Sequence, residues 1–271
     1  MPVSIIVPTF NQADYLRPCL DSIWFQDYPE IEIVLVNDGS TDETAHIIDG
    51  FLQDLNSARV SYASLYDGEQ NQIRRVFHSR YPEQGRRLHI LTHETNRGLA
   101  AALNTGFKAC TGEMCTYVPS DNICLPTMVS ALARPLSENA DFTYADMFIV
   151  DDAMNIKRKF ELPDYSFKRC FGDWYLCGVA KMYRRKLHDR FGYYDERLLA
   201  HDHELFQRFA MGGARFFHVA QPLMYVRAHD GDREVEIHSP TNWNRLLGES
   251  KEIVMKARGF LETQPGSENQ L

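Results

Sequence analysis

The sequence predicts a mixed α/β fold, in which a mostly parallel β-sheet is flanked by helices. Two nearly continuous apolar and β-branched runs, Val3–Val7 and Ile31–Val36, are typical of strands buried on both faces of a parallel sheet. Each run is followed by residues whose apolar positions recur at helical spacing. This strand-helix-strand-helix opening implies right-handed crossovers between parallel strands.

The first two strand-helix units can be bounded from their residues. The first strand is expected to end at Pro8, and the helix after it presents one apolar stripe formed by Leu16, Cys19, Leu20 and Ile23. The second strand stops at Asn37–Ser40, and Ser40 with Glu43 has the S-x-x-E spacing of a capping box. That spacing predicts a helix with Ile47, Ile48, Phe51 and Leu55 facing inward.

The rest of the first half is less uniform. Residues 56–87 are rich in Tyr, Arg and Gln, and we expect an irregular excursion there before a third strand at Leu88–Thr92. Asn96–Gly98 then opens a helix with Leu99, Leu103 and Phe107 on one face. A fourth strand is predicted at Met114–Val118, and it ends at Pro119–Asn122.

The regular alternation of predicted strands and helices ends after residue 122, and no linker separates the two parts of the chain. We therefore expect one domain over residues 1–262, with halves at 1–122 and 123–262, and a flexible polar tail at 263–271. The elements expected in the second half are a helix near Thr127–Leu136, a strand near Phe142–Val150, an aromatic loop through Trp174 and Tyr175, a strand at Gly178–Tyr183, and a helix that ends at Gly212–Gly213.

Composition limits the class of partner and the compartment. The formal net charge of −8 over 271 residues argues against sequence-independent binding to nucleic acid, which needs an excess of Lys and Arg. The six cysteines include no C-x-x-C pair and sit mostly among apolar neighbours, as free thiols do in a reducing cytoplasm. No apolar stretch approaches the length of a membrane span, and no secretory leader is apparent. We expect a cytoplasmic protein.

Three polar clusters follow predicted strands: Pro8–Asn11, Asn37–Ser40 and Ser120–Asn122. In open α/β sheets ligands bind beyond the carboxyl ends of the strands, so the three clusters are expected to line one crevice. The same residue types also form ordinary turns, and for Asp38 alone the residues leave turn formation and ligand binding equally open.

Six segments follow one another along the chain in this order: VSIIVPTFNQADYLRPCLDSI, IVLVNDGSTD, NRGLAAALNTGFKACTGE, YVPSDN, FGYYDERLLAHDHELFQRF and LMYVRAH. Together they resemble the family 2 glycosyltransferases with a GT-A fold, whose first half is Rossmann-like. The resemblance implies that a sugar moves from a nucleoside-diphosphate sugar, a uridine nucleotide by default, to an acceptor hydroxyl with inversion. The acceptor would be a carbohydrate or a glycoconjugate.

The resemblance also assigns the donor site and its metal. Asp121 matches the last aspartate of the family's Asp-x-Asp motif, which holds a divalent cation such as Mn²⁺ or Mg²⁺, and Pro119 replaces the first aspartate. His229 matches a further metal ligand of the family, although the residues alone describe it as an exposed loop histidine. The nucleotide-sugar-binding positions implied are Pro8, Thr9, Asn11, Asp38, Arg97, Gly98, Ser120 and Asp121.

The cluster His201–Glu204 matches the place where the family has its catalytic aspartate. Asp202 would take the acceptor proton, since a hydroxyl is a poor nucleophile until it is deprotonated; the alternative is that Asp202 only caps the helix. His201 and His203 are expected near the acceptor, and a zinc site on them is disfavoured because no third ligand accompanies them. Trp174 either stacks on a sugar ring or belongs to the core.

Two other functions remain open from the sequence. The protein could be a nucleotide-sugar-binding module without turnover, which the departures at Pro119 and at His201, where the family commonly has Glu, allow. A nucleotidyltransferase would need a glycine- and lysine-rich phosphate loop after the first strand, and PTFNQADYL contains no glycine. The sequence does not define the acceptor, the oligomeric state, or whether the protein associates with the inner face of a membrane.

Overall fold

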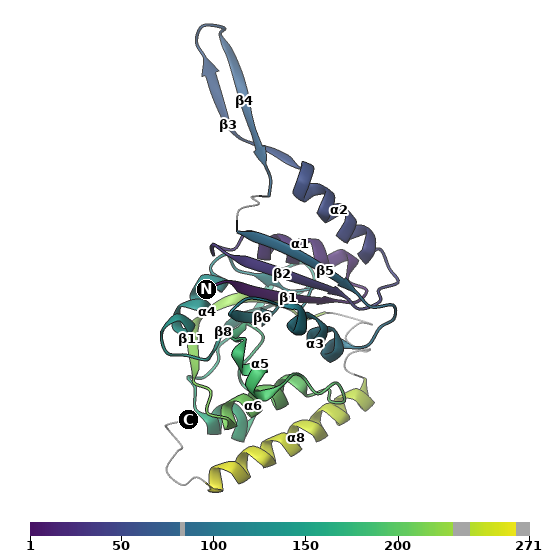
Figure 1. Ribbon diagram of the computed structural model, residues 1–271, viewed down its shortest axis with the longest axis vertical. Coiled ribbons are helices and arrows are strands. Elements are labelled where there is room, and N and C mark those ends of the chain that lie inside the picture. Colours follow the sequence, from purple (N-terminus) through teal and green to yellow (C-terminus); the bar gives the residue numbers. More distant parts are fainter. Residues whose placement is uncertain (82–84, 230–238, 264–271) are drawn as a thin grey trace.

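The structure, a computed structural model, describes residues 1–81, 85–229 and 239–263. A nine-stranded sheet runs through both halves in the order β5-β2-β1-β6-β10-β8-β11-β7, and β9 pairs with β8 (Figure 1). The predicted mixed α/β fold is confirmed. The strands of this sheet are β1 (Val3–Thr9), β2 (Ile31–Asn37), β5 (Arg86–Thr92), β6 (Met114–Tyr117), β7 (Ile123–Cys124), β8 (Phe142–Val150), β9 (Ile156–Phe160), β10 (Lys181–Arg184) and β11 (Phe216–Arg227).

The first half of the sheet is parallel, because β1 pairs in parallel with β2 and β6, and β2 with β5. Strand β1 continues past the predicted stop at Pro8 and pairs Thr9 with Asn37. The pairing of β1 with β6 ends at Ile6. Pro8 has no amide hydrogen to donate, but no residue of β6 is paired with it, so no hydrogen bond of the sheet is lost on that side. The helices between these strands are α1 (Ala13–Trp24), α2 (Thr44–Ser57) and α3 (Leu99–Ala109).

The two faces of this parallel half are covered by different helices. Alternate residues of β1 point to opposite faces: Ile5 belongs to the apolar cluster that includes α1 and α2, and Ile6 to the cluster that includes α3. Because α1 leads from β1 to β2, and α3 leads from β5 back to β6, the chain reverses direction across the sheet between β1 and β6. Such a switch point leaves a crevice at the carboxyl ends of the two strands.

The predicted capping box at the start of α2 is wrong. Glu43 occupies the N-cap position and its side chain makes no capping hydrogen bond; the amide of Thr44, the first residue of the helix, donates instead to Asp42 Oδ1. The hydroxyl of Ser40 accepts instead from the amide of Asn11, at 3.0 Å. The loops after β1 and β2 lie against each other, so Ser40 joins the two loops and does not cap its own helix.

The segment expected to be an irregular excursion is a regular hairpin. Strands β3 (Arg59–Asp67) and β4 (Gln72–Ser79) form a separate two-stranded sheet that projects from the body beyond α2 (Figure 1). Tyr81 lies at its base, fully buried against Trp24 and Phe51. A lone hairpin is marginally stable, so this anchor is needed. The projecting part leaves Leu65, Tyr66, Ile73 and Phe77 exposed.

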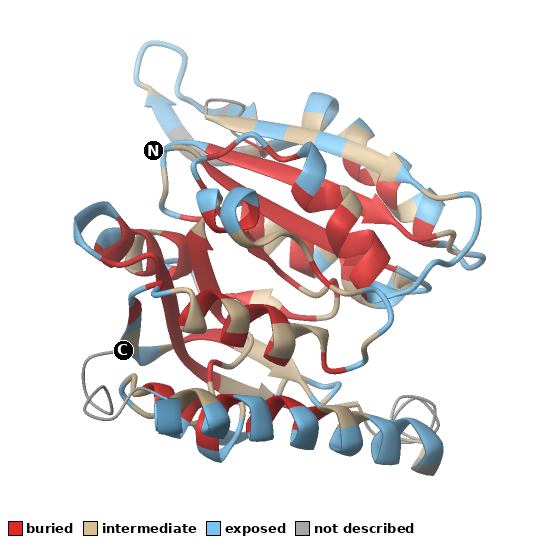
Figure 2. Cartoon of the chain, turned by 60° about the horizontal axis from the view of Figure 1, so that its bottom comes forward, coloured by how far each residue is buried: buried red, intermediate tan, exposed pale blue. Residues whose placement is uncertain are grey.

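The second half of the structure packs mixed strands against short helices. Its helical elements are α4 (Met128–Glu138), the π-helical turn η1 (Lys168–Asp173), α5 (Lys186–Phe191), α6 (His201–Met211) and α8 (Pro240–Thr263). Helix α8, which is not among the elements predicted from sequence, packs on α6 and η1 and exposes its outer side (Figure 2). The predicted tail lies, apart from its first residue, outside the described residues.

Two expectations from composition can be compared with the structure. All six cysteines are buried and free, as expected. None of the helices in the described ranges combines the length and the apolar character needed to cross a membrane.

We predict that Gly39→Ala destabilises the protein more than Gly213→Ala does. Both glycines have positive φ, +71° and +84°, so an alanine at either position carries a backbone cost of about 1–2 kcal/mol. Only at Gly39 would the added Cβ also meet backbone, at 2.5 Å from the Thr95 carbonyl carbon. Chemical denaturation measures both variants, and equal losses in the free energy of unfolding would show that the loops do not meet as described.

Candidate functional site

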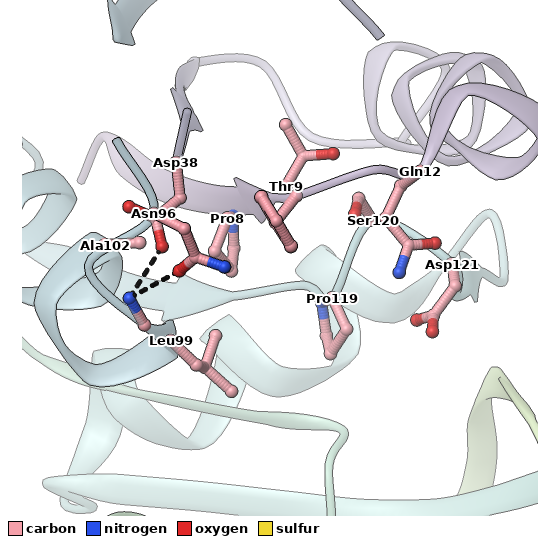
Figure 3. Close-up of a pocket in the computed structure, with 12 residues that line it drawn as sticks. Pro8, Thr9, Gln12, Asp38, Asn96, Leu99, Ala102, Pro119, Ser120 and Asp121 are labelled. Atoms are coloured by element: carbon pink, nitrogen blue, oxygen red, sulfur yellow. Dashed lines mark hydrogen bonds between the residues drawn. The ribbon is translucent and has the colours of Figure 1, made fainter. Parts of the chain in front are cut away.

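The three polar clusters predicted at strand ends meet at the switch point. They line one cavity of about 350 Å³, which we call the switch-point pocket (Figure 3). Its lining combines loop residues after β1, β2 and β6 with the start of α3: Pro8, Thr9, Phe10, Gln12, Asp38, Asn96, Gly98, Leu99, Ala102, Pro119, Ser120 and Asp121.

Asp38 joins the loop after β2 to the loop before α3. Its Oδ2 accepts from the Gly98 amide at 2.8 Å (Figure 3). Its Oδ1 accepts from the Arg97 amide at 2.9 Å. His93 Nδ1 lies 2.6 Å from Oδ1, and the Asp38 side chain is only 4% exposed. The Asp38 carboxylate therefore lines the pocket, and its hydrogen bonds also hold the backbone of the loop before α3 in place.

Two buried oxygens in the switch-point pocket have no hydrogen-bond partner among the described residues. They are Thr9 Oγ1 and Gln12 Oε1. Buried polar groups are almost always hydrogen-bonded in folded proteins. Unused acceptors and donors on a cavity wall indicate a polar ligand.

Two of the predicted nucleotide-binding residues do not line this cavity. Asn11, at φ +51°, accepts from the Thr41 amide through its side-chain oxygen at 2.8 Å, and so ties the first two loops together. Arg97 contributes its amide to Asp38, and the residue as a whole is exposed. The other predicted residues, Pro8, Thr9, Asp38, Gly98, Ser120 and Asp121, all line the pocket.

At one end of the pocket His229 lies between two carboxylates. Its Nε2 is 3.0 Å from Asp121 Oδ2, and its Nδ1 is 3.0 Å from Asp152 Oδ1. A neutral imidazole carries one N–H and can donate to only one of them. If that N–H is directed to Asp152, the lone pair of Nε2 faces a carboxylate oxygen, so a proton or a metal cation is required on the Asp121 side.

This arrangement fits a divalent cation that takes only part of its coordination from the protein. Asp121 offers a carboxylate oxygen and His229 a nitrogen whose other ring position is held by a carboxylate, the usual support for a metal-ligating histidine. Within the described ranges no group of three or more His, Cys, Asp or Glu side chains is placed to hold a metal. Ligands such as phosphate oxygens and water would complete the shell.

A second cavity of about 380 Å³, the Asp202 pocket, adjoins the first, and Leu99 lines both. Asp202 lies in the first turn of α6, whose N-cap is Ala200, so the capping interpretation of Asp202 is wrong. The amide of Ala200 donates instead to Glu249 of α8, at 2.9 Å. The remaining wall consists of Tyr117, Trp174, Tyr175, Leu199, Ala200, His201, His203, Trp243, Leu246, Leu247 and Ser250.

The Asp202 carboxylate is held through one oxygen. Oδ2 accepts from the Tyr117 hydroxyl at 2.6 Å and from Lys181 Nζ at 3.1 Å. Oδ1 is buried and has no partner among the described residues. Burial alone would raise the pKa of Asp202, but the charges of Lys181 and His201 and the hydrogen bond from Tyr117 outweigh it and hold the pKa below its ordinary value. Asp202 is therefore an ionised carboxylate at neutral pH.

The predicted acceptor residues all line the Asp202 pocket. His203 is 3% exposed, stacks on Tyr175 with ring centroids 5.4 Å apart, and has its pKa lowered to about 4 by burial, so it is neutral at pH 7. Trp174 is 44% exposed and so is not a core residue. Trp243 of α8 lines the same pocket and is similarly exposed. A mostly apolar pocket with aromatic rings at an ionised carboxylate suits a ring-shaped polar molecule.

Several residues that line a pocket or contact Asp202 are not among those predicted from sequence. Gln12 and Asn96 are next to predicted residues in the sequence. Their position in loops that follow strands is the only signal that could have identified them. Tyr117 ends a strand and looks like core. Lys181 is the one missed residue with a distinct signal, because it is a lone charge in the otherwise apolar run Cys177–Tyr183.

Comparison with known proteins gives consistent results. Residues 4–65 and 63–192 match the family model described as Glycosyl transferase family 2. Over 152 residues the chain is 30% identical to the glycosyltransferase GlyG of Streptococcus pneumoniae, an alignment that covers 56% of this chain and 40% of that protein. The chain thus spans less than half the length of this curated relative.

Solved structures share the fold. The crystal structure of S. aureus TarS 1–349 in complex with UDP has a TM-score of 0.66 and 22% identity, covering 95% of this chain and 65% of that one. The mannosyltransferase PcManGT from Pyrobaculum calidifontis, in complex with GDP-Man and Mn²⁺, has a TM-score of 0.61 and 19% identity, covering 97% and 70%. These likenesses support the GT-A-like mixed α/β architecture expected from the sequence.

We predict that Asp38→Asn lowers the free energy of unfolding by about 1–3 kcal/mol, the usual cost of leaving buried partners of a charged group unsatisfied. The amide side chain has one acceptor oxygen, whereas the carboxylate serves the Arg97 and Gly98 amides with one oxygen each. Asp49→Asn, at an exposed position of α2, is the matched control. Equal stability of the two variants in urea would contradict the structural role of Asp38.

Proposed function

Because this chain belongs to glycosyltransferase family 2, we propose that it transfers a sugar from a nucleoside-diphosphate sugar to an acceptor hydroxyl with inversion at the anomeric carbon. The observation that carries the proposal is the pair of adjoining cavities that share Leu99, one lined by Asp121 and the other by the ionised Asp202. Residues 1–122 would bind the donor nucleotide, and residues 123–262 would bind the acceptor.

The switch-point pocket is proposed as the donor site. Its unpartnered oxygens on Thr9 and Gln12 suit the hydrogen-bonding edges of a base and a ribose. The fold neighbours named above were solved with UDP and with GDP-Man, which supports a nucleoside diphosphate as the donor class. We propose a uridine nucleotide as the donor.

Asp121 and His229 are proposed to hold Mn²⁺ or Mg²⁺. The donor set fits, because the Asp121 carboxylate oxygen and His229 Nε2 lie 3.0 Å apart and could serve as neighbouring ligands of one cation. A bound cation would offset the negative charge that develops on the departing diphosphate. Pro119 replaces the first motif aspartate, so the protein would supply these two ligands, and phosphate oxygens would complete the shell.

Asp202 is proposed as the general base. As the acceptor oxygen forms its bond to the anomeric carbon, its proton passes to the Asp202 carboxylate. The bond from the anomeric carbon to the diphosphate breaks on the opposite face, so one displacement inverts the configuration. No covalent intermediate with the protein is needed. Trp174, His201 and His203 would orient the acceptor in the Asp202 pocket.

The two alternatives from the sequence have no observation in their favour. A binding module without turnover does not explain a buried lysine and a tyrosine held on Asp202. For a nucleotidyltransferase, the loop after β1 still lacks the glycine- and lysine-rich phosphate cradle.

We predict that one nucleoside diphosphate among UDP, GDP, TDP and CDP raises the melting temperature, and that Mn²⁺ increases the rise. A ligand at one hundred times its Kd stabilises the folded state by about 2.7 kcal/mol. Asp121→Asn and His229→Gln should lose the Mn²⁺-dependent part of the shift, and Asp49→Asn should keep it. Absence of any shift with all four nucleotides would contradict the donor site.

We predict that Asp202→Asn lowers kcat for sugar transfer by about 10²–10⁴-fold, the usual contribution of a positioned base. Nucleotide binding should be unchanged, because Asp202 does not line the switch-point pocket. Transfer is measured by nucleotide release with an oligosaccharide acceptor panel, and Asp189→Asn on the exposed side of α5 is the control. Wild-type turnover in Asp202→Asn would remove Asp202 from the mechanism.

A further inference from the structure

Lys181 of β10 is the most deeply buried charged side chain near either pocket, with 0% exposure. Burying an ammonium group is costly unless it is paired. Its Nζ lies 3.1 Å from Asp202 Oδ2 and 3.5 Å from the carbonyl oxygen of Gly178. It therefore sits in the middle of the sheet with its charge directed to the proposed base.

The rings around Lys181 complete this environment. Nζ lies 4.2 Å from the ring centroid of Tyr117 and 5.2 Å from that of Phe206, within the range of cation–π attraction. Tyr117 also donates its hydroxyl to the same Asp202 oxygen, at 2.6 Å. One carboxylate oxygen thus receives two donors from two different strands, while Asp202 itself belongs to a helix.

Titratable side chains surround Asp202, and they belong to each of the elements packed around it. Lys181 and His201 contribute positive charge that lowers the pKa of Asp202, while burial raises the pKa of Tyr117 well above its ordinary value and keeps it protonated. Glu249 of α8 accepts hydrogen bonds from the Leu199 and Ala200 amides. The other groups that line the pocket or interact electrostatically with Asp202 are Tyr175, Cys177, Tyr183, Tyr194 and His203.

We propose that Lys181 and Tyr117 are positioning residues for Asp202: together they fix the direction of its carboxylate and keep it ionised while the acceptor excludes water. This inference rests on the proposed function of Asp202 as the base. The geometry is specific, because both donors reach the same oxygen, Oδ2, whereas Oδ1 is buried and has no hydrogen-bond partner among the described residues. Removal of Lys181 would leave a largely buried carboxylate without its nearest cation.

The direct test is the pH dependence of transfer in Lys181→Met, a change that keeps the length of the side chain and removes its charge. Since the base must be ionised, activity rises with pH through the pKa of Asp202. Loss of the cation raises that pKa, so the acidic limb of kcat/KM should move to higher pH by a unit or more. At neutral pH Asp202 stays ionised after a shift of this size, so the expected fall in kcat, at least tenfold, reports the lost orientation of the carboxylate and should not recover as the pH is raised.

Matched variants separate positioning from folding. Tyr117→Phe keeps the ring over Lys181, removes only the hydroxyl, and should shift the acidic limb in the same direction by a smaller amount. Lys181→Met combined with Asp202→Asn removes both charges, and should fold better than Lys181→Met alone while remaining inactive. Lys186→Met, at an exposed position of α5, should leave the pH profile unchanged.

The outcomes also distinguish this inference from the proposed function. If the wild type transfers sugar through Asp202 but Lys181→Met and Tyr117→Phe keep the wild-type acidic limb, the positioning role is wrong and the base role stands. A loss of stability with an unshifted limb would also overturn it. If no transfer is detected, ¹³C NMR titration of the Asp202 carboxyl decides, since the inference requires a higher pKa in Lys181→Met than in the wild type.

Discussion

The parallel pairing of β2, β1 and β6 is the constraint on which the rest of the site depends. Parallel strands end at one edge of the sheet, and the reversal of the chain between β1 and β6 keeps helices from filling the space beyond that edge. Three loops therefore meet there, and Asp38 fastens the second loop to the start of α3 through two backbone amides. The pocket is thus a consequence of the topology, and its side chains adapt it to a polar ligand.

The second half of the chain continues the same sheet, and its strands support the carboxylate of Asp202. Antiparallel β10 lies beside β6, so Lys181 and Tyr117 come from neighbouring strands and converge beneath the first turn of α6. A carboxylate supported in this way is ionised and oriented although it is largely enclosed. Helix α8 then closes the outer wall with Trp243. The family model matches up to residue 192, and Trp243 lies beyond that match.

Sequence reasoning succeeded where a local pattern and a tertiary role coincide. Asp121 follows a buried strand in the sequence, and it lines the switch-point pocket as expected; its role as a metal ligand stays a prediction. The hairpin was missed because its strands form a separate two-stranded sheet and their alternation of apolar and polar residues is interrupted, at Ala63 and at Arg74–Arg75. Ser40 was misassigned because its partner, Asn11, is brought near by the fold. Lys181 carried a visible signal, a charge within an apolar strand, but its partner Asp202 could be identified only in three dimensions.

The central claim is that donor and acceptor are bound in two adjoining pockets, with the leaving group at Asp121 and the base at Asp202. A crystal structure of the protein with UDP and Mn²⁺ tests it most directly. The account predicts the nucleoside against Thr9 and Gln12, the diphosphate beside Asp121 and His229, and the Asp202 pocket open toward the end of the diphosphate. A nucleotide bound elsewhere, or a diphosphate directed away from the Asp202 pocket, would contradict it.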